Sequence, residues 1–362
     1  MRPISKGPLE IVEISGLPQM LSIDITISAE EAARSASGEF VIVGRGLPVF
    51  PGQETVIRTR AGERDRPEPL LTGYVRDIET GYSESDRTLS CSFISRTVDL
   101  VETSIDHPSG EILNKDLSAI ARELDSAGVG IETDGSPFPV ERRHKIIEGE
   151  SHFSSIARRA RGRGVLIHDT PKGRLKLSTK PGGIHAGMLK RGVNILPGAS
   201  ASFTEAGRYS ETRVRGQQSE GTQKQQLRPQ TKVKDSGVKR NRVLILSHEG
   251  EATIDRMRTR ATWQANRAAG NSVTASIPVT GWRDEAGEIW HENWLVHVDD
   301  DWLGIEGLMI IKSVVLSQRG DDKTFATLSL ADPRALGGEN PRGKTSAGYA
   351  APGAIEAEYE DE

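Results

Sequence analysis

The feature that most constrains the fold of this 362-residue chain is a strand–loop–strand pattern that occurs twice. The two copies lie 236 residues apart, and the same offset covers both strands and the loop between them. The matched stretches are 75–78 with 311–314, 86–89 with 322–325 and, after a four-residue slip, Val49 and Val56 with Ile289 and Val296. We therefore predict one β module in two copies, which is more typical of an assembly protein than of a catalytic cleft.

Composition and residue alternation agree with β modules. The chain has 38 Gly and 18 Pro, about one residue in six, which favours short strands joined by turns over long helices. Cys91 shares one strand face with Leu89 and Phe93, so we expect a core position rather than a reactive thiol. The strands expected in the first module, residues 1–100, are 22–28, 40–43, 55–59, 71–79 and 88–94.

Helical periodicity appears in the next part of the chain, residues 101–190. The elements expected there are a helix over 112–128 with Leu113, Leu117, Ile120 and Leu124 on one face, a helix over 151–161, and a hairpin of 165–168 and 174–178. These elements predict a small α/β region between the two β modules.

The second β region is expected over residues 191–336. It is interrupted by a polar loop, 217–240, without apolar periodicity, which predicts mobility. The other elements expected are a helix over 249–269, with Ile254, Met257, Ala261 and Ala268 on one stripe, and strands at 273–279, 295–298, 309–316 and 323–330. Residues 337–362 predict a disordered acidic tail. The fold class expected is mainly β with an α/β insert, that is, two antiparallel β-barrel or β-sandwich modules flanking a small α/β region.

Charge and cysteine content exclude several classes of protein. The formal net charge is −4, which argues against the whole chain being a polyanion binder. One cysteine excludes internal disulfides and cysteine-ligated metal clusters. No window approaches the roughly 20 apolar residues of a membrane span, and residues 1–9 lack the apolar region of a signal peptide. We therefore expect synthesis in the cytoplasm and no membrane span.

Residues that could carry chemistry are few. His291, His297 and 299–301, three consecutive Asp, suit a metal ion by type, but Asp is also common where a strand meets a turn. No Gly-x-Ser-x-Gly elbow, phosphate-binding loop or dinucleotide fingerprint is present. Paired carboxylates for glycoside cleavage stay open, because any two acids can meet in space. We nominate no catalytic, cofactor-binding or metal-binding residue, and we expect no cofactor and no enzymatic activity.

Two uneven distributions suggest contact surfaces. Residues 142–191 carry thirteen Lys and Arg, which suits either phosphate contact or, as we prefer, a solvated or salt-bridged face. Trp282, Trp290, Trp294 and Trp302 lie within 21 residues. Strand alternation cannot bury all four on one face, so one or two are expected at a protein interface.

Three stretches together give the chain a recognisable pattern. They are 71–78 followed by 89–91 and 96–100; 148–151 to 164–167 followed by 173–175; and 281–282 to 290 followed by 293–298 and 308–316. In this order and spacing the chain resembles the baseplate hub proteins of Mu-like contractile-tailed bacteriophages, related to the late-control D proteins. The resemblance covers most of residues 7–336, and none of the stretches is a catalytic signature.

The resemblance implies a structural role in a virion. It implies a homotrimer in which each subunit contributes two tail-tube-like β domains, giving a pseudo-sixfold ring that joins a hexameric tail tube to a trimeric central spike. The expected partners are the tail tube protein, the spike protein, other baseplate proteins, and DNA that passes through the channel without sequence-specific binding. The alternatives are a hub-like part of a phage-tail-like bacteriocin or type VI secretion spike and, from another class, a tail-associated peptidoglycan hydrolase.

Overall fold

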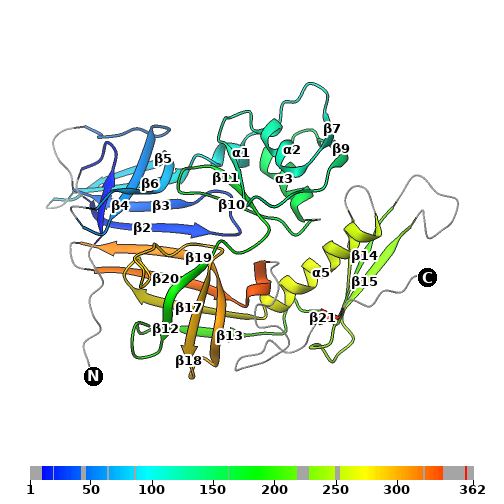
Figure 1. The fold of residues 1–362 in the computed structure, drawn as a ribbon. Coiled ribbons are helices and arrows are strands. Elements are labelled where there is room, and N and C mark those ends of the chain that lie inside the picture. The colour runs from blue at the N-terminus through cyan, green and yellow to red at the C-terminus, as the bar shows by residue number, and fades with distance from the viewer. Residues whose placement is uncertain are drawn as a thin grey trace.

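The computed structural model describes residues 10–18, 20–41, 46–62, 65–84, 87–161, 163–217, 228–248, 253–320, 323–336 and 355–356. Strands dominate, as the sequence predicts, and most of them belong to one sheet of twelve strands. Figure 1 shows this sheet as a stack of strands, with the helices gathered on one side of it.

The first module contributes six strands in the spatial order β1-β4-β5-β6-β3-β2. Their bounds are β1 (Ile11–Ile14), β2 (Met20–Ser28), β3 (Ser35–Phe40), β4 (Glu54–Arg60), β5 (Glu68–Tyr82) and β6 (Arg87–Ser95). Four of the five predicted strands are confirmed. The strand expected at 40–43 overlaps the described strands only at Phe40, the last residue of β3, and its residues 42 and 43 lie outside the described part of the chain. Cys91 is buried as predicted, and burial raises the pKa of its thiol.

The second module repeats this topology. Its strands are β12 (Ile184–Lys190), β13 (Ser200–Phe203), β17 (Val273–Thr280), β18 (Leu295–Asp300), β19 (Ile305–Arg319) and β20 (Lys323–Ala331). Their pairings give the order β12-β18-β19-β20-β17-β13. Ranked along the chain, both modules read 1-4-5-6-3-2. The duplication predicted from two short matches therefore extends to the order of all six strands, although the first-ranked strand is antiparallel to its neighbour in the first module and parallel in the second.

One hydrogen-bond pair identifies equivalent positions in the two modules. Val75 exchanges backbone hydrogen bonds with Gly52 and Gln53, just as Ile311 does with Asn293 and Trp294. A β-bulge follows at once in both strands, between Val75 and Asp77 and between Ile311 and Ser313. The offset of 236 is therefore correct for β5 and β19.

The predicted offset is wrong for the other two strand pairs. The inward-facing residues of β6 are Leu89, Cys91 and Phe93, and those of β20 are Ala326, Leu328 and Leu330, so the offset there is 237. The physical reason is the length of the hairpin: Val75 and Phe93 are 18 residues apart, whereas their counterparts Ile311 and Leu330 are 19 apart, so the second hairpin has one residue more. Between β4 and β18 the pairings give 241 rather than 240.

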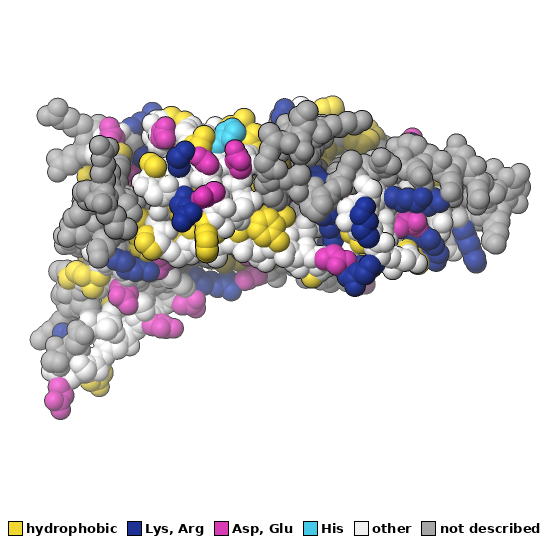
Figure 2. Space-filling view, turned by 90° about the horizontal axis from the view of Figure 1, so that it is seen from below, with side chains coloured by type: hydrophobic (Ala, Val, Ile, Leu, Met, Phe, Trp, Pro, Cys, Tyr) yellow, Lys and Arg dark blue, Asp and Glu magenta, His cyan; other side chains and the backbone are white. Residues whose placement is uncertain are grey.

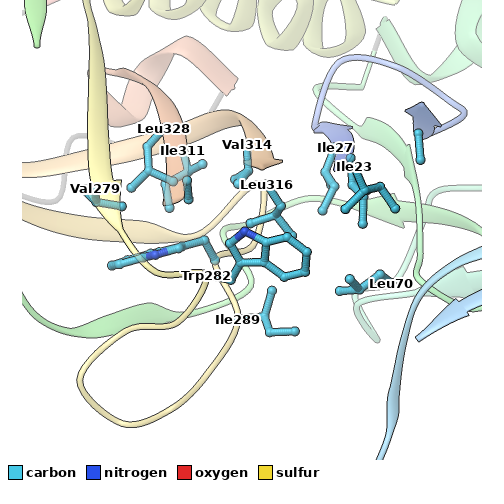
Figure 3. Close-up of a cluster of buried hydrophobic side chains, with 14 of the residues drawn as sticks. Ile23, Ile27, Leu70, Val279, Trp282, Ile289, Ile311, Val314, Leu316 and Leu328 are labelled. Carbon is cyan, nitrogen blue, oxygen red and sulfur yellow. The ribbon is translucent and has the colours of Figure 1, made fainter. Parts of the chain in front are cut away.

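The two modules share a core. Strand β2 pairs with β19, and this pairing joins the modules into one sheet. Figure 3 shows side chains from both modules in contact there, with Trp282 between Leu316 and Ile289. The Trp282 indole N–H donates to the carbonyls of Ser317 and Phe325 at 3.0 and 3.1 Å, so its polar atom is satisfied inside the core.

The region between the modules has its own apolar core. It contains α1 (Val98–Glu102), β7 (Glu111–Lys115), α2 (Leu117–Leu124), β8 (Ile131–Thr133), β9 (Glu141–Lys145), α3 (His152–Arg161), β10 (Leu166–Asp169) and β11 (Leu175–Ser178). Helix α3 and the β10–β11 hairpin confirm their predictions. The following strand, β12, was expected to belong with this region, but it pairs with β18 of the second module.

The helix expected over 112–128 is wrong at both ends, because α2 begins at Leu117 and ends at Leu124. Residues 111–115 form β7, which pairs with β9, and the Leu113 side chain is 51% exposed. Asp116 then caps α2 by accepting the Ala119 N–H at 2.8 Å, so the helix begins at Leu117. Leu113 matches the helical spacing, but the capping residue overrides that spacing.

An insert between β13 and β17 forms a small sheet covered by a helix. Its elements are β14 (Glu211–Arg215), β15 (Gln230–Asp235), β16 (Val243–Ser247) and α5 (Ile254–Gly270). Val214, Val233 and Met257 pack between the sheet and the helix. The predicted stripe on α5 holds for Met257 and Ala261, whereas Ile254 is exposed.

Two other predictions need correction at this insert. The loop expected over 217–240 contains β15, whose Thr231, Val233 and Asp235 are buried, while 218–227 lie outside the described residues. The tail expected over 337–362 also lies outside them, except for the two-residue strand β21 (Ile355–Glu356), which pairs antiparallel with β15. The 3-10 turn η1 (Pro333–Leu336) ends the second module. Among the described residues, no helix has the length and apolar character needed to cross a membrane.

Candidate functional site

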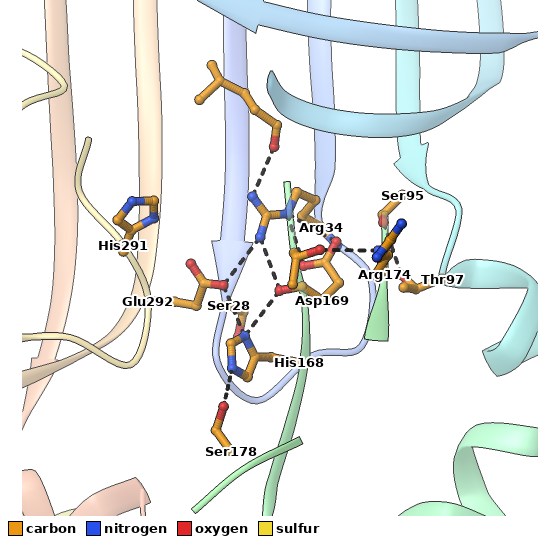
Figure 4. Close-up of polar contacts among 12 residues, drawn as sticks. Ser28, Arg34, Ser95, Thr97, His168, Asp169, Arg174, Ser178, His291 and Glu292 are labelled. Carbon is orange, nitrogen blue, oxygen red and sulfur yellow. Dashed lines mark hydrogen bonds and ion pairs between the residues drawn. The ribbon is translucent and has the colours of Figure 1, made fainter. Parts of the chain in front are cut away.

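The most concentrated group of buried charges joins three parts of the chain. Arg34 lies between β2 and β3, His168 and Asp169 end β10, and Glu292 precedes β18. All four side chains are buried, and Figure 4 shows them pointing toward one another. Because isolated buried charges are costly, this grouping is the first place to look for chemistry.

Arg34 is the centre of the group. Its Nε donates to both Asp169 carboxylate oxygens at 3.0 Å, and its terminal nitrogens donate to the Leu70 carbonyl at 2.9 Å and to Glu292 at 3.3 Å. The backbone N–H of Arg34 also donates to Asp169 at 3.2 Å. Arg34 thereby connects the first module to the α/β region and to the second module.

One cation faces two carboxylates, so the carboxylates titrate differently. Burial raises the pKa of Asp169, and attraction to Arg34 only partly offsets it. Burial also acts to raise the pKa of Glu292, but Arg34 and the hydrogen bond from His168 outweigh it and lower the pKa to about 2.

The same group contains the connectivity of a hydrolytic triad. Ser178 Oγ lies 3.1 Å from His168 Nε2, and His168 Nδ1 lies 3.1 Å from Glu292 Oε1. Ser178, however, is buried beside a cavity of only about 10 Å³, which is room for about one water molecule. A scissile carbonyl has no space to reach the hydroxyl, so this arrangement holds segments together rather than activating a nucleophile.

The histidines and aspartates considered as metal ligands do not converge. His291 contacts Glu288 at 2.9 Å, and Asp299 and Asp301 pair with Lys190 at 2.6 Å and Arg191 at 2.8 Å. Asp300 instead accepts the N–H groups of Trp302 and Leu303, which closes the turn between β18 and β19. In the described part of the chain, no group of three His, Cys, Asp or Glu side chains could hold a metal ion.

The basic stretch is largely paired within the chain. Arg158 contacts Glu150 at 2.7 Å, Arg163 contacts Glu141, and buried Arg159 donates to His144 at 3.0 Å. These guanidinium groups contact other residues of the α/β region rather than pointing into solvent. The salt-bridged interpretation of residues 142–191 therefore fits the contacts better than phosphate binding does.

The four clustered tryptophans differ in exposure, as the alternation argument predicts. Trp282 and Trp290 are buried and Trp294 is half-buried, whereas the Trp302 side chain is 81% exposed. Figure 2 shows apolar side chains scattered among charged ones on the lower face of the molecule. The large exposed apolar side chains of β12, β13 and the nearby turns are Ile184, Met188, Val193, Phe203 and Trp302.

Sequence reasoning missed the buried charged group entirely. Asp169 was expected in the turn of a hairpin, a common place for Asp, and it is instead the last residue of β10. Arg34 is 135 residues from Asp169 and 258 from Glu292, so no local spacing connects them. The one available signal was Arg34 itself, the only basic residue in the two strands and the connection between them.

Comparisons with known proteins agree with this description of the molecule. A family model described as baseplate hub protein gp44-like, second domain, matches residues 97–179. A model described as Mu phage baseplate assembly protein GpP, fourth domain, matches residues 253–339. The chain is also 24% identical over 279 residues to the baseplate hub protein gp44 of Escherichia phage Mu, covering 72% of each protein.

Solved structures extend the similarity over nearly the whole chain. The 43 kDa tail protein of prophage MuSo2 from Shewanella oneidensis is 29% identical, with a TM-score of 0.76 over 90% of this chain and 99% of that one. A tail protein from Neisseria meningitidis shares the fold, with 18% identity and a TM-score of 0.72 over 90% of this chain and 96% of that one. Two family models, a curated relative and a solved structure thus all show that the chain is similar to the baseplate hub proteins of Mu-like bacteriophage tails.

Proposed function

We propose that this hub assembles as a homotrimeric ring between a hexameric tail tube and a trimeric central spike, with a central channel through which DNA leaves the particle. The observation that carries the proposal is the six-strand order that occurs twice in the chain. Each chain has two like modules, so a trimer presents six like modules to a partner with sixfold symmetry. The same trimer presents three identical chains to a partner with threefold symmetry. A duplicated module therefore suits a symmetry adaptor.

The proposed role is mechanical and needs no cofactor. The two modules share one sheet and one core, so a force applied to one module is transmitted to the other through β2 and β19. We propose that the α/β region is a separate unit of the ring subunit, beginning near residue 97 and ending before β12. The charged group around Arg34 holds this unit against both modules.

Light scattering of the purified protein tests the ring. The chain has a mass of 39.4 kDa, so a trimer has a mass of about 118 kDa. Negative-stain images of that species should show a ring with a central hole. The same measurement is repeated with the tube and spike proteins added, because the ring could require these partners in order to assemble. A monomer under both conditions contradicts the proposal.

A cell-wall zymogram tests the competing hydrolase function. We expect no clearing by the wild-type chain. Clearing that disappears in Ser178→Ala or Glu292→Gln would overturn the structural role, because those side chains have the triad connectivity described above.

A further inference from the structure

The two modules of one chain are joined by the antiparallel pairing of β2 with β19, which we call the β2–β19 joint. This joint is a template for a second joint of the same kind. Strand β2 pairs antiparallel with residues 313–319 of β19. In this pairing Val314 lies opposite Ile27, and both side chains are buried. The joint therefore combines main-chain hydrogen bonds with an apolar cross-strand pair.

The equivalent edge of the first module is exposed. Strand β5 corresponds to β19, and its pairing with β4 ends at Tyr74. Beyond the bulge, residues 77–82 pair with β6 on one side, and no described strand lies on the other side. Most side chains of this half of β5 are exposed, including Tyr82 at 91%. A long open edge of this kind is a ready template for another strand.

The strand equivalent to β2 lies at the opposite end of the sheet. By rank in the chain and by position in the sheet it is β13, the terminal strand, which pairs with β17. Ala199 and Ala201 face the shared core, as Ile23 and Ile25 do in β2. Figure 1 shows β13 at the bottom of the stack of strands and β5 at the top, so the two cannot meet within one chain.

We propose that β13 of one subunit pairs antiparallel with residues 77–82 of β5 in the neighbouring subunit, repeating the β2–β19 joint between chains. Transferring the known register through the equivalent strands places Phe203 opposite Ile78, Ser202 opposite Glu79 and Ala201 opposite Thr80. This interface rests on the proposed ring and names the strand edges that form it.

The transferred register brings apolar groups together. Phe203 takes the place of Ile27, and Ile78 takes the place of Val314, so the buried pair of the template has an apolar counterpart. In the single chain the Phe203 side chain is 54% exposed and Ile78 is only partly buried. A register shifted by one residue would instead turn these side chains to opposite faces of the sheet.

The proposed joint also has the symmetry that a ring requires. It joins two different surfaces, β13 and β5, so it is heterologous and propagates in one direction. The joints inside and between chains then alternate around the ring, and each pairs a second-ranked strand with a fifth-ranked one. All modules thereby make equivalent contacts, although only half of the joints lie between chains.

Disulfide cross-linking tests this pairing directly. On a Cys91→Ala background, Glu79→Cys with Ser202→Cys places thiols on directly opposed residues, within the distance that a disulfide spans. We expect mild oxidation of the ring, with tube and spike proteins present if closure needs them, to give a covalent trimer that reduction returns to monomer. Both substituted positions are surface positions, so folding should be unaffected.

Two matched variants complete the design. Thr26→Cys with Val315→Cys are opposite residues in the β2–β19 joint and should form a disulfide within one chain. Thr80→Cys with Ser202→Cys are one residue out of register and should not cross-link. If light scattering shows a trimer and the within-chain control forms, but Glu79→Cys with Ser202→Cys stays monomeric, this interface is wrong and the ring stands. If no ring forms with the partners present, both proposals fall.

Discussion

The two β modules have the same six strands in the same order but differ in what surrounds them. In the second module, the edge of β19 is covered by β2 and the connection between the second- and third-ranked strands carries the β14–α5 insert. In the first module, the corresponding edge of β5 is open beyond Tyr74, and the same connection is the short segment that carries Arg34. The duplicated sheet is therefore the constant part, and edges and connections are where the copies acquire different roles.

The constancy of the sheet predicts the largest effect. Val75 and Ile311 occupy equivalent positions next to the bulge, and both are buried. An unpaired carboxylate at either position should lower the free energy of unfolding by more than about 4 kcal/mol. We therefore expect Val75→Asp and Ile311→Asp each to prevent stable folding, measured by thermal denaturation.

Volume-matched substitutions separate charge from shape in this test. Val75→Thr keeps the shape of the side chain but buries a hydroxyl, and Ile311→Val removes one methylene, so both should remain folded, with losses of about 1–3 and about 1 kcal/mol. Normal thermal stability of either Asp variant would contradict the equivalence of the two positions and the assignment of both to the core.

The second largest loss of stability is expected at Arg34, in the connection between β2 and β3. Arg34→Met leaves Asp169 and Glu292 buried without their cation, which should cost about 3–5 kcal/mol. Urea denaturation measures the loss. In the double variant Arg34→Met with Glu292→Gln one of the two uncompensated charges is gone, so part of the stability should return. A double variant no more stable than Arg34→Met would show that Glu292 is not coupled to Arg34.

The part of the fold that sequence reasoning predicts well is the part governed by local alternation. Strand β2, the β5–β6 hairpin and the buried position of Cys91 follow from period-two patterns, and the module repeat follows from comparing two such patterns. The spacing that indicates a helix at Leu113 is equally compatible with a strand of five residues, and a single capping Asp decides between them. The alternation of apolar and polar residues therefore predicts these strands without ambiguity. Helical spacing does not, because it alone does not predict where the helix begins.

The candidate site and the strand edges could not be predicted, because both depend on contacts between distant segments. Arg34, Asp169 and Glu292 each have unremarkable neighbours in sequence, and their burial becomes evident only once three segments meet. The open edge of β5 likewise depends on where β4 ends, which is a property of pairing rather than of residue type. The change of offset by one residue was also missed, since one additional residue in the second hairpin shifts every later match.

The α/β region contains a buried histidine, His144, that favours the folded state only while it is neutral, and the second module contains another, His185, whereas the first module has no histidine. His144 is fully buried, its Nδ1 accepts the Arg159 Nε–H at 3.0 Å, and its Nε2 contacts Ser155 Oγ at 2.8 Å. Burial, followed by the nearby Arg159 and Arg158, lowers the pKa of His144 to about 4. Protonation would place a new N–H against a guanidinium that already donates to that nitrogen.

This low pKa predicts an acid-sensitive α/β region next to a first module without histidine. The unfolded chain binds a proton at His144 below a pH of about 6.5, whereas the folded chain does so only near 4, so the contribution is complete above 6.5 and is lost as the pH falls toward 4. The loss reaches at most about 3 kcal/mol. His144→Gln, which keeps one donor and one acceptor, should flatten this pH dependence in urea denaturation monitored between pH 4 and 7. Hydrogen exchange should localise the loss that His144→Gln removes to residues 97–179, and equal acid sensitivity of β5 would show instead that the α/β region and the first module unfold as one unit.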